Sequence, residues 1–138
     1  MAEQLEYENE KRYKEAETKF YETGDLKYLW EVKDDIEHAI RSAMRLLIQQ
    51  RTGSPDTYQE HFYELAEEGF LYFLERCKRG YARKQANSES KLGGPIKGKL
   101  ITYCYWIARY LLSNKFEEYY NQQGFEDTAI SYDDLENI

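Results

Sequence analysis

The most distinctive chemistry in the sequence lies in the stretch KLITYCYWIARYLL at residues 99–112, which places four large aromatic side chains within eight positions. They are Tyr103, Tyr105, Trp106 and Tyr110. Aromatic rings can stack on the unpaired bases of a single-stranded nucleic acid, where each base contributes about 1–3 kcal/mol. Rings at helical spacing are also typical of a hydrophobic core, so the pattern by itself leaves both interpretations open.

A basic segment directly precedes the aromatic stretch. Between residues 76 and 99 the chain has eight basic residues and one acidic residue, a net charge of +7, whereas the rest of the chain carries −14. Cationic side chains that bind phosphates, next to rings that stack on bases, are the combination that a single strand requires. The overall charge of −7 argues against a plain, non-specific nucleic-acid binder. The split in charge therefore predicts two faces with different partners.

Helices are predicted to position these residues, because β-type alternation is scarce and only two prolines occur. Apolar side chains that recur every three or four residues predict four helices. They cover about residues 3–21, 26–50, 56–78 and 96–122. Gly24 and Gly53 are expected to end the first two helices, Asp25 to begin the second, and Ser54 with Pro55 to cap the third.

The same periodicity predicts which side chains form the core. The expected inner positions are Leu5, Tyr13, Ala16, Phe20, Leu29, Ile36, Ile40, Ala43, Met44, Leu47, Phe62, Leu65, Ala66, Phe73, Leu74 and Cys77. Cys77 and Cys104 lack metal-ligand spacing and lie in helical apolar patterns. We therefore expect both to be small core residues in a reducing compartment, without a disulfide.

These elements predict an all-α fold, a compact bundle of about four helices, for which 138 residues are sufficient. The bundle is expected at residues 25–123, after a charged N-terminal helix at residues 1–24. Gly80 is expected to begin an exposed, mobile basic loop, and residues 124–138 to form an acidic tail that is frayed or folds only on a partner. The N-terminus shows no apolar signal region and no apolar stretch is long enough to span a membrane, so we expect a cytoplasmic protein.

The order of residues in the aromatic stretch resembles conserved region 2 of the bacterial sigma factors, roughly K-F-S-T-Y-A-x-W-W-I-R. The residues that match at the same spacing are Lys99, Thr102, Tyr103, Trp106 and Arg109. Upstream, ELAEEGFLYFLERC at residues 64–77 resembles the family's D-L-x-Q-E-G-x-x-G-L-x-x-A, and IEHAIRSAMRLLIQQ at residues 36–50 resembles the helix that precedes it. The resemblance covers about residues 33–122.

In sigma factors this domain binds the clamp helices of the largest RNA polymerase subunit and opens promoter DNA at the minus-ten element. The resemblance implies a polymerase-binding set of Glu64, Leu65, Glu67, Glu68 and Leu71. It implies a DNA-binding set of Arg83, Lys97, Lys99, Thr102, Tyr103, Trp106 and Arg109. In that set Tyr103 and Trp106 would receive a base of the non-template strand, and the lysines with Arg83 would contact phosphates.

The chain also departs from the family pattern. Ile107 stands where the family has its second tryptophan, and Leu100 stands in place of a phenylalanine, so fewer rings face the DNA. Residues 86–98 form an insertion, and no helix-turn-helix for the minus-thirty-five element follows within this sequence. In these respects the chain resembles minimal bacteriophage late sigma factors, which rely on other proteins for the second contact. The acidic tail could be the contact site for such a co-activator.

Patterns that would indicate catalysis are weak. Asp35 precedes His38 by three residues, as in di-iron bundles, but the other histidine, His61, is not preceded by a matching carboxylate. The glutamates near Glu64 are typical of a solvated helix face, and no histidine, phosphate-binding loop or reactive serine accompanies them. We expect no enzymatic activity, no metal and no cofactor.

Two other functions fit the sequence. Long charged helices, many tyrosines and an acidic tail would also suit a helical adaptor or ring protein of a bacteriophage particle. Alternatively, a sigma-like fold could bind the polymerase only as an inhibitor. Oligomeric state separates the adaptor from the initiation factor, and substitution of the aromatic residues separates the initiation factor from the inhibitor.

Overall fold

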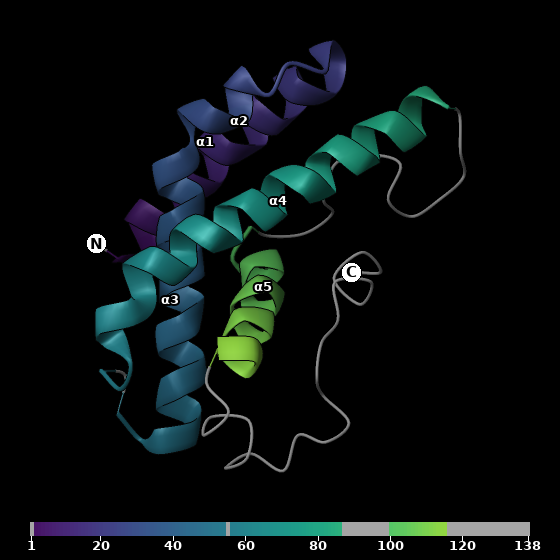
Figure 1. Ribbon diagram of the computed structural model, residues 1–138. Helices are drawn as coiled ribbons and strands as arrows, with labels where there is room; N and C mark the ends of the chain where they lie inside the picture. The colour runs from purple at the N-terminus through teal and green to yellow at the C-terminus, as the bar shows by residue number, and fades with distance from the viewer. Residues whose placement is uncertain (1, 55, 87–99, 116–138) are drawn as a thin grey trace.

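The computed structural model describes residues 2–54, 56–86 and 100–115, and all the regular structure in these ranges is helical (Figure 1). The elements are α1 (Ala2–Thr23), α2 (Lys27–Glu31), α3 (Lys33–Thr52), the 3₁₀ helix η1 (Gln59–His61), α4 (Phe62–Gln85) and α5 (Leu100–Lys115). The predicted all-α bundle is therefore confirmed. None of the described helices is long and apolar enough to cross a membrane.

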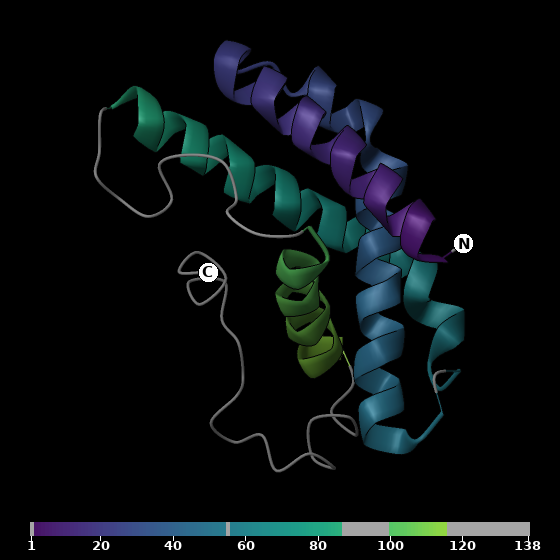
Figure 2. The ribbon, with the colours of Figure 1, turned by 180° about the vertical axis from the view of Figure 1, so that it is seen from behind.

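The centre of the bundle is α3, which packs against both α4 and α5 (Figure 1). α4 crosses α3 obliquely, and α5 lies beside α3 below the crossing. α1 packs against α2 and runs across α3 on the opposite side, as the view from behind shows (Figure 2). Among the described elements, α5 packs mainly against α3 and α4.

The contact of α3, α4 and α5 is made possible by Gly69 in α4. A Cβ atom at this position would lie 3.0 Å from Ile40 Cδ1, 3.1 Å from Ile107 Cγ2 and 3.1 Å from Leu111 Cδ1. These distances are shorter than ordinary van der Waals contacts, so only a hydrogen fits between the helices without a shift of the neighbours. The glycine of the E-E-G motif therefore has a packing role in this chain.

The predicted core is confirmed almost in full. Every expected inner position from Tyr13 onward is buried, and the side chain of Leu5 lies outside the described part. Tyr13, Phe73 and Tyr103 form a chain of edge-to-face ring contacts through the core, with centroid distances of 5.5 and 5.4 Å. Cys77 and Cys104 are buried free thiols, and burial raises the pKa of both.

α1 is attached to the bundle by polar contacts as well as by its apolar stripe. Both carboxylate oxygens of Glu10 accept the backbone N–H of Leu100, at 2.9 and 2.8 Å, and so hold the first described residue of α5. Arg76 donates a hydrogen bond from Nη1 to the Tyr21 hydroxyl at 3.0 Å, inside the protein. The charged N-terminal helix is thus packed on the elements that carry the aromatic stretch.

The predicted second helix is interrupted. Val32 adopts φ −109° and ψ 21°, and this change of direction separates the short α2 from α3. Leu29 and Val32 are buried, whereas Trp30 between them is exposed. The expected ends are confirmed, because Gly24 and Gly53 both have positive φ values, 75° and 77°.

The predicted start of the third helix is wrong. Residues 56–58 form turns, Tyr58 has a φ of 64°, and η1 follows before α4 begins at Phe62. Ser54 therefore does not cap this helix; instead its hydroxyl accepts the Asp56 N–H within a turn, at 3.4 Å.

The predicted end of the third helix is also wrong, because α4 continues through Gly80 to Gln85. The extra turn is held by tertiary packing. The Tyr81 ring contacts Phe20, at a centroid distance of 5.6 Å, and a Cβ atom on Gly24 would lie only 2.6 Å from Tyr81 Cζ. The remainder of the expected loop at residues 87–99, the acidic tail at 124–138 and both ends of the predicted fourth helix lie outside the described residues.

Candidate functional site

α5 has a closed side and an open side. Its closed side is formed by Leu100, Tyr103, Cys104, Ile107, Ala108, Leu111 and Leu112, which are all buried. Its open side carries Thr102, which is exposed, and Tyr105, Trp106, Arg109 and Tyr110, which are partly exposed. The expectation that part of the aromatic surface lies outside the core is therefore met, although with a different division of the rings.

Tyr103 belongs to the closed side, which corrects the expectation that it receives a base together with Trp106. Its side chain is 2 % exposed, and its ring packs edge-on against Phe73. Two side chains that are three residues apart lie about 60° apart around a helix. The edge of the core falls between the two rings, so Tyr103 is enclosed and Trp106 is partly exposed. In this structure the Tyr103 ring has no open surface on which a base could stack.

Trp106 is the centre of the open side. Its ring contacts Tyr105 edge-on at a centroid distance of 5.9 Å, and the guanidinium carbon of Arg109 lies 5.9 Å from its centroid. Tyr110 contacts Tyr72 of α4 at 5.2 Å. Rings that are partly exposed and lie beside a guanidinium group form a platform suited to a base and its phosphate.

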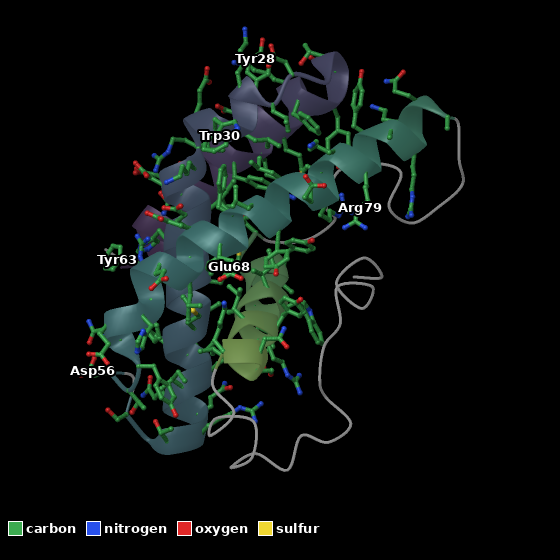
Figure 3. All side chains as sticks on the ribbon, in the orientation of Figure 1. Tyr28, Trp30, Asp56, Tyr63, Glu68 and Arg79 are labelled. Atoms are coloured by element: carbon green, nitrogen blue, oxygen red, sulfur yellow. The ribbon has the colours of Figure 1, made fainter. Side chains whose placement is uncertain are left out.

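α4 adds side chains to this platform that the sequence reading did not single out. Tyr72 and Arg79 are partly exposed, as is Arg83, which was predicted. Figure 3 shows Arg79 extending from the side of α4 that faces α5. The sequence signal for them is the spacing of Tyr72, Arg79 and Arg83, seven and four residues apart, which places them on one side of a helix. Lys97 and Lys99 of the predicted DNA-binding set lie outside the described residues.

A shallow groove borders the open side on the α3 flank. It has a volume of about 260 Å³ and is lined by Ala43, Leu46, Ile101, Thr102 and Tyr105. Leu46 is one of the few large apolar side chains on the described surface that are exposed. The lining is almost entirely apolar, so Thr102 lies at the rim of a hydrophobic groove rather than in a polar pocket.

The five predicted polymerase-binding residues are divided by the structure. Glu64, Glu67 and Leu71 are exposed on one stripe of α4, and Leu71 has 56 % of its surface exposed. Leu65 is 4 % exposed and lies in the core, so its assignment to a docking surface is corrected. Glu68 faces α5 (Figure 3) and its Oε2 lies 3.6 Å from Lys115 Nζ.

Two aromatic side chains beside this stripe were missed by the sequence reading. Tyr63 is 70 % exposed and points away from the bundle (Figure 3), with the Arg41 guanidinium 4.4 Å from its ring centroid. Trp30 is exposed and contacts the buried Phe70 edge-on at 4.9 Å. Trp30 lies in α2, two residues before the change of direction at Val32.

The stripe is acidic, and Lys33 of α3 is close enough to be influenced by Glu67. Lys33 Nζ lies 2.9 Å from Glu37 Oε2, and this hydrogen bond is the main cause of the raised pKa of Lys33, to which Glu67 makes a smaller contribution. Among the described residues, no group of three or more His, Cys, Asp or Glu side chains is placed to hold a metal ion.

Comparison with known proteins does not assign the chain to a family. No family model matches it, and no curated protein or solved structure matches it significantly.

Proposed function

We propose that the protein is a sigma-like transcription initiation factor that binds a multisubunit RNA polymerase and opens promoter DNA at a minus-ten-like element. One observation supports it above the others: α4 and α5 together carry two unlike surfaces. The stripe of Glu64, Glu67 and Leu71 is acidic with an exposed leucine, whereas Trp106 and Arg109 lie on an aromatic and cationic platform. The acidic stripe lies on α4, and the platform lies on the neighbouring helix, α5.

The acidic stripe is the proposed contact with the polymerase. Glutamates around an exposed leucine suit a partner helix that carries basic and apolar side chains, such as the clamp helices that the resemblance implies. Tyr63 and Trp30 extend the same surface, and exposed aromatic side chains are frequent anchors in protein interfaces. Leu65 supports this surface from beneath.

The platform on α5 is the proposed contact with the non-template strand. Unpairing a base costs a few kcal/mol, and stacking on Trp106 would offset that cost. Arg109 and Thr102 would line the path of the strand, and Arg83 with Lys97 and Lys99 would contact phosphates. The acidic tail would contact a co-activator. Such a protein would act in the cytoplasm of a bacterial host, without a cofactor and without enzymatic activity of its own.

Recovery of polymerase with the tagged full-length protein from its native cells tests the docking half. Glu67→Lys reverses one exposed charge on the stripe, so recovery of the largest subunit should fall about tenfold or more, because like charges in an interface cost several kcal/mol. Glu15→Lys makes the same change on the exposed side of α1 and should leave recovery unaltered. Glu67 is preferred to Glu68, whose ion pair with Lys115 would complicate the result. If the wild-type protein recovers no polymerase, the proposal fails.

A structural adaptor of a bacteriophage particle is the second candidate, and the exposed Trp30, Tyr63 and Leu71 favour it because they fit any protein partner. Light scattering of the purified protein separates the two: an initiation factor is monomeric, whereas an adaptor forms closed rings. A polymerase-binding inhibitor is separated by Trp106→Ala. Loss of promoter opening with polymerase recovery retained supports initiation, whereas no effect of the substitution supports an inhibitor.

A further inference from the structure

One side of α4 carries a row of side chains to which the resemblance gives no role beyond Arg83. Tyr72, Arg76, Arg79 and Arg83 follow one another at intervals of four, three and four residues. This spacing confines them to a stripe about 60° wide around the helix. The Tyr72 ring contacts Tyr110 of α5, so the stripe faces the line along which α4 and α5 meet, which we call the α4–α5 seam.

Two ring contacts fix the order of groups along the α4–α5 seam. Tyr72 and Tyr110 lie together at one end. Further along α4, the Arg76 guanidinium carbon lies 6.0 Å from the centroid of Tyr103. Arg79 and Arg83 follow Arg76 at about 4.5 and 10.5 Å further along α4. The seam therefore changes from aromatic at one end to cationic at the other.

The arginines of the row differ in what they can contact. Arg76 is buried and donates to the Tyr21 hydroxyl, so it shapes the seam and does not face a ligand. Arg79 and Arg83 are partly exposed, and Figure 3 shows Arg79 directed to the side where α5 lies. The Nε and Nη2 atoms of Arg79 are buried, so this side chain can present only the exposed part of its guanidinium group to a phosphate, as a charge-assisted donor.

We propose that the α4–α5 seam is a path for single-stranded nucleic acid, in which Arg79 and Arg83 bind phosphates of the strand whose bases lie on Trp106 and Tyr110. The inference rests on the proposed contact between α5 and DNA, and it adds α4 as the second wall of that site. From Tyr72 to Arg83 the row rises about 16 Å along the helix. This length corresponds to about five nucleotides at the stacked spacing of 3.4 Å.

The chain offers a matched pair of substitutions to test the path. Arg79→Ala removes one positive charge from the α4–α5 seam. Lys78→Ala removes one from the neighbouring position, which is exposed, lies about 100° away around the helix and pairs with Glu75 at 3.2 Å. The probe is a fluorescein-labelled oligothymidylate of about 12 nucleotides, and binding is followed by fluorescence anisotropy between about 50 and 200 mM salt.

Arg79→Ala should weaken binding about 5- to 10-fold at about 50 mM salt and reduce the slope of log affinity against log salt by about 0.7, the share of one phosphate contact in single-strand binding. Lys78→Ala should change neither quantity.

Trp106→Ala should weaken binding about 5- to 150-fold with the slope unchanged, because a stacked base releases no counterion. Arg79→Gln, which keeps the length of the side chain, replaces the alanine variant if thermal unfolding shows that the latter is not folded, and the same loss is expected.

Three results would overturn the inference: no binding of oligothymidylate by the wild-type protein, an equal loss in the Arg79 and Lys78 variants, or a salt slope that Arg79→Ala leaves unchanged. The proposed function fails separately, on the recovery of polymerase. Arg79→Ala should retain that recovery in full, since Arg79 lies about 120° around α4 from Glu67, away from the acidic stripe.

Discussion

The closed and open sides of α5 carry similar side chains, but neighbouring helices bury those on the closed side and leave those on the open side partly exposed. Tyr103 and Trp106 are three residues apart, yet one ring is enclosed between α4 and the rest of the core and the other is partly exposed beside Arg109. Nothing in their chemistry requires this order. The difference arises because Arg76 and Phe73 of α4 cover Tyr103, whereas no described element covers Trp106 to the same extent. The packing of α4 thus divides the aromatic side chains of α5 into an enclosed group and an exposed group.

Truncation of each ring gives the largest expected effect and is the most direct way to break this comparison. Tyr103→Ala should lower the free energy of unfolding by about 3–5 kcal/mol, because it leaves a cavity in the core. Trp106→Ala should lower it by about 1 kcal/mol, since the ring already contacts water on one side. Urea denaturation followed by circular dichroism measures both. Equal losses would mean that the two sides of α5 are not distinct.

Gly69 offers a second, smaller test, because it sets how closely α4 approaches the closed side of α5. Gly69→Ala brings a methyl group within 3.1 Å of Ile40, Ile107 and Leu111. Overpacking costs about 1–3 kcal/mol and the better helix propensity of alanine returns up to about 1 kcal/mol, so we expect a net loss of about 1 kcal/mol in unfolding free energy.

A double substitution provides the control for this prediction. Ile40→Val removes the Cδ1 atom that lies nearest to the added methyl group. If the loss comes from overpacking, Gly69→Ala combined with Ile40→Val should be less destabilised than the sum of the two single variants. Simple additivity in thermal or urea unfolding would contradict the role assigned to this glycine.

The sequence was sufficient to predict the closed side of the bundle but not its open side. Apolar periodicity located Ile40, Phe73 and the rest of the core, because burial requires a repeat that the chain itself displays. It placed Leu65 in that core as well, while the resemblance assigned the same residue to a docking surface, and the structure agrees with the periodicity. At Leu65 the apolar periodicity predicted the position of the side chain correctly, and the motif did not.

What could not be predicted depends on contacts between distant segments. Gly80 is typical of a loop, but α4 continues through it because Tyr81 packs on Gly24 and Phe20, more than fifty residues earlier in the chain. The interruption at Val32, which divides the predicted second helix into α2 and α3, is likewise not revealed by propensity. Both errors concern the ends of helices, where tertiary contacts decide how far a helix extends.

The two cysteines test the closed side with no substitution at all, and here the expected effect is smallest. Cys104 lies on α5 and Cys77 on α4, and burial raises the pKa of both thiols above their ordinary value of 9.0, because the thiolate is disfavoured in the core. In the native protein at neutral pH neither thiol should react with an aromatic disulfide reagent within minutes, whereas both should react in denaturant.

The same two thiols give the sign of a pH dependence. In the unfolded chain they ionise near pH 9, while in the folded protein they stay protonated, so their contribution to stability is complete below that pH and is lost as the pH rises. Between about pH 7.5 and 9 we expect the free energy of unfolding to fall by no more than about 1 kcal/mol in total. Rapid labelling of Cys104 in the native state would show instead that α5 separates from its neighbours, and the enclosure of Tyr103 would then be transient.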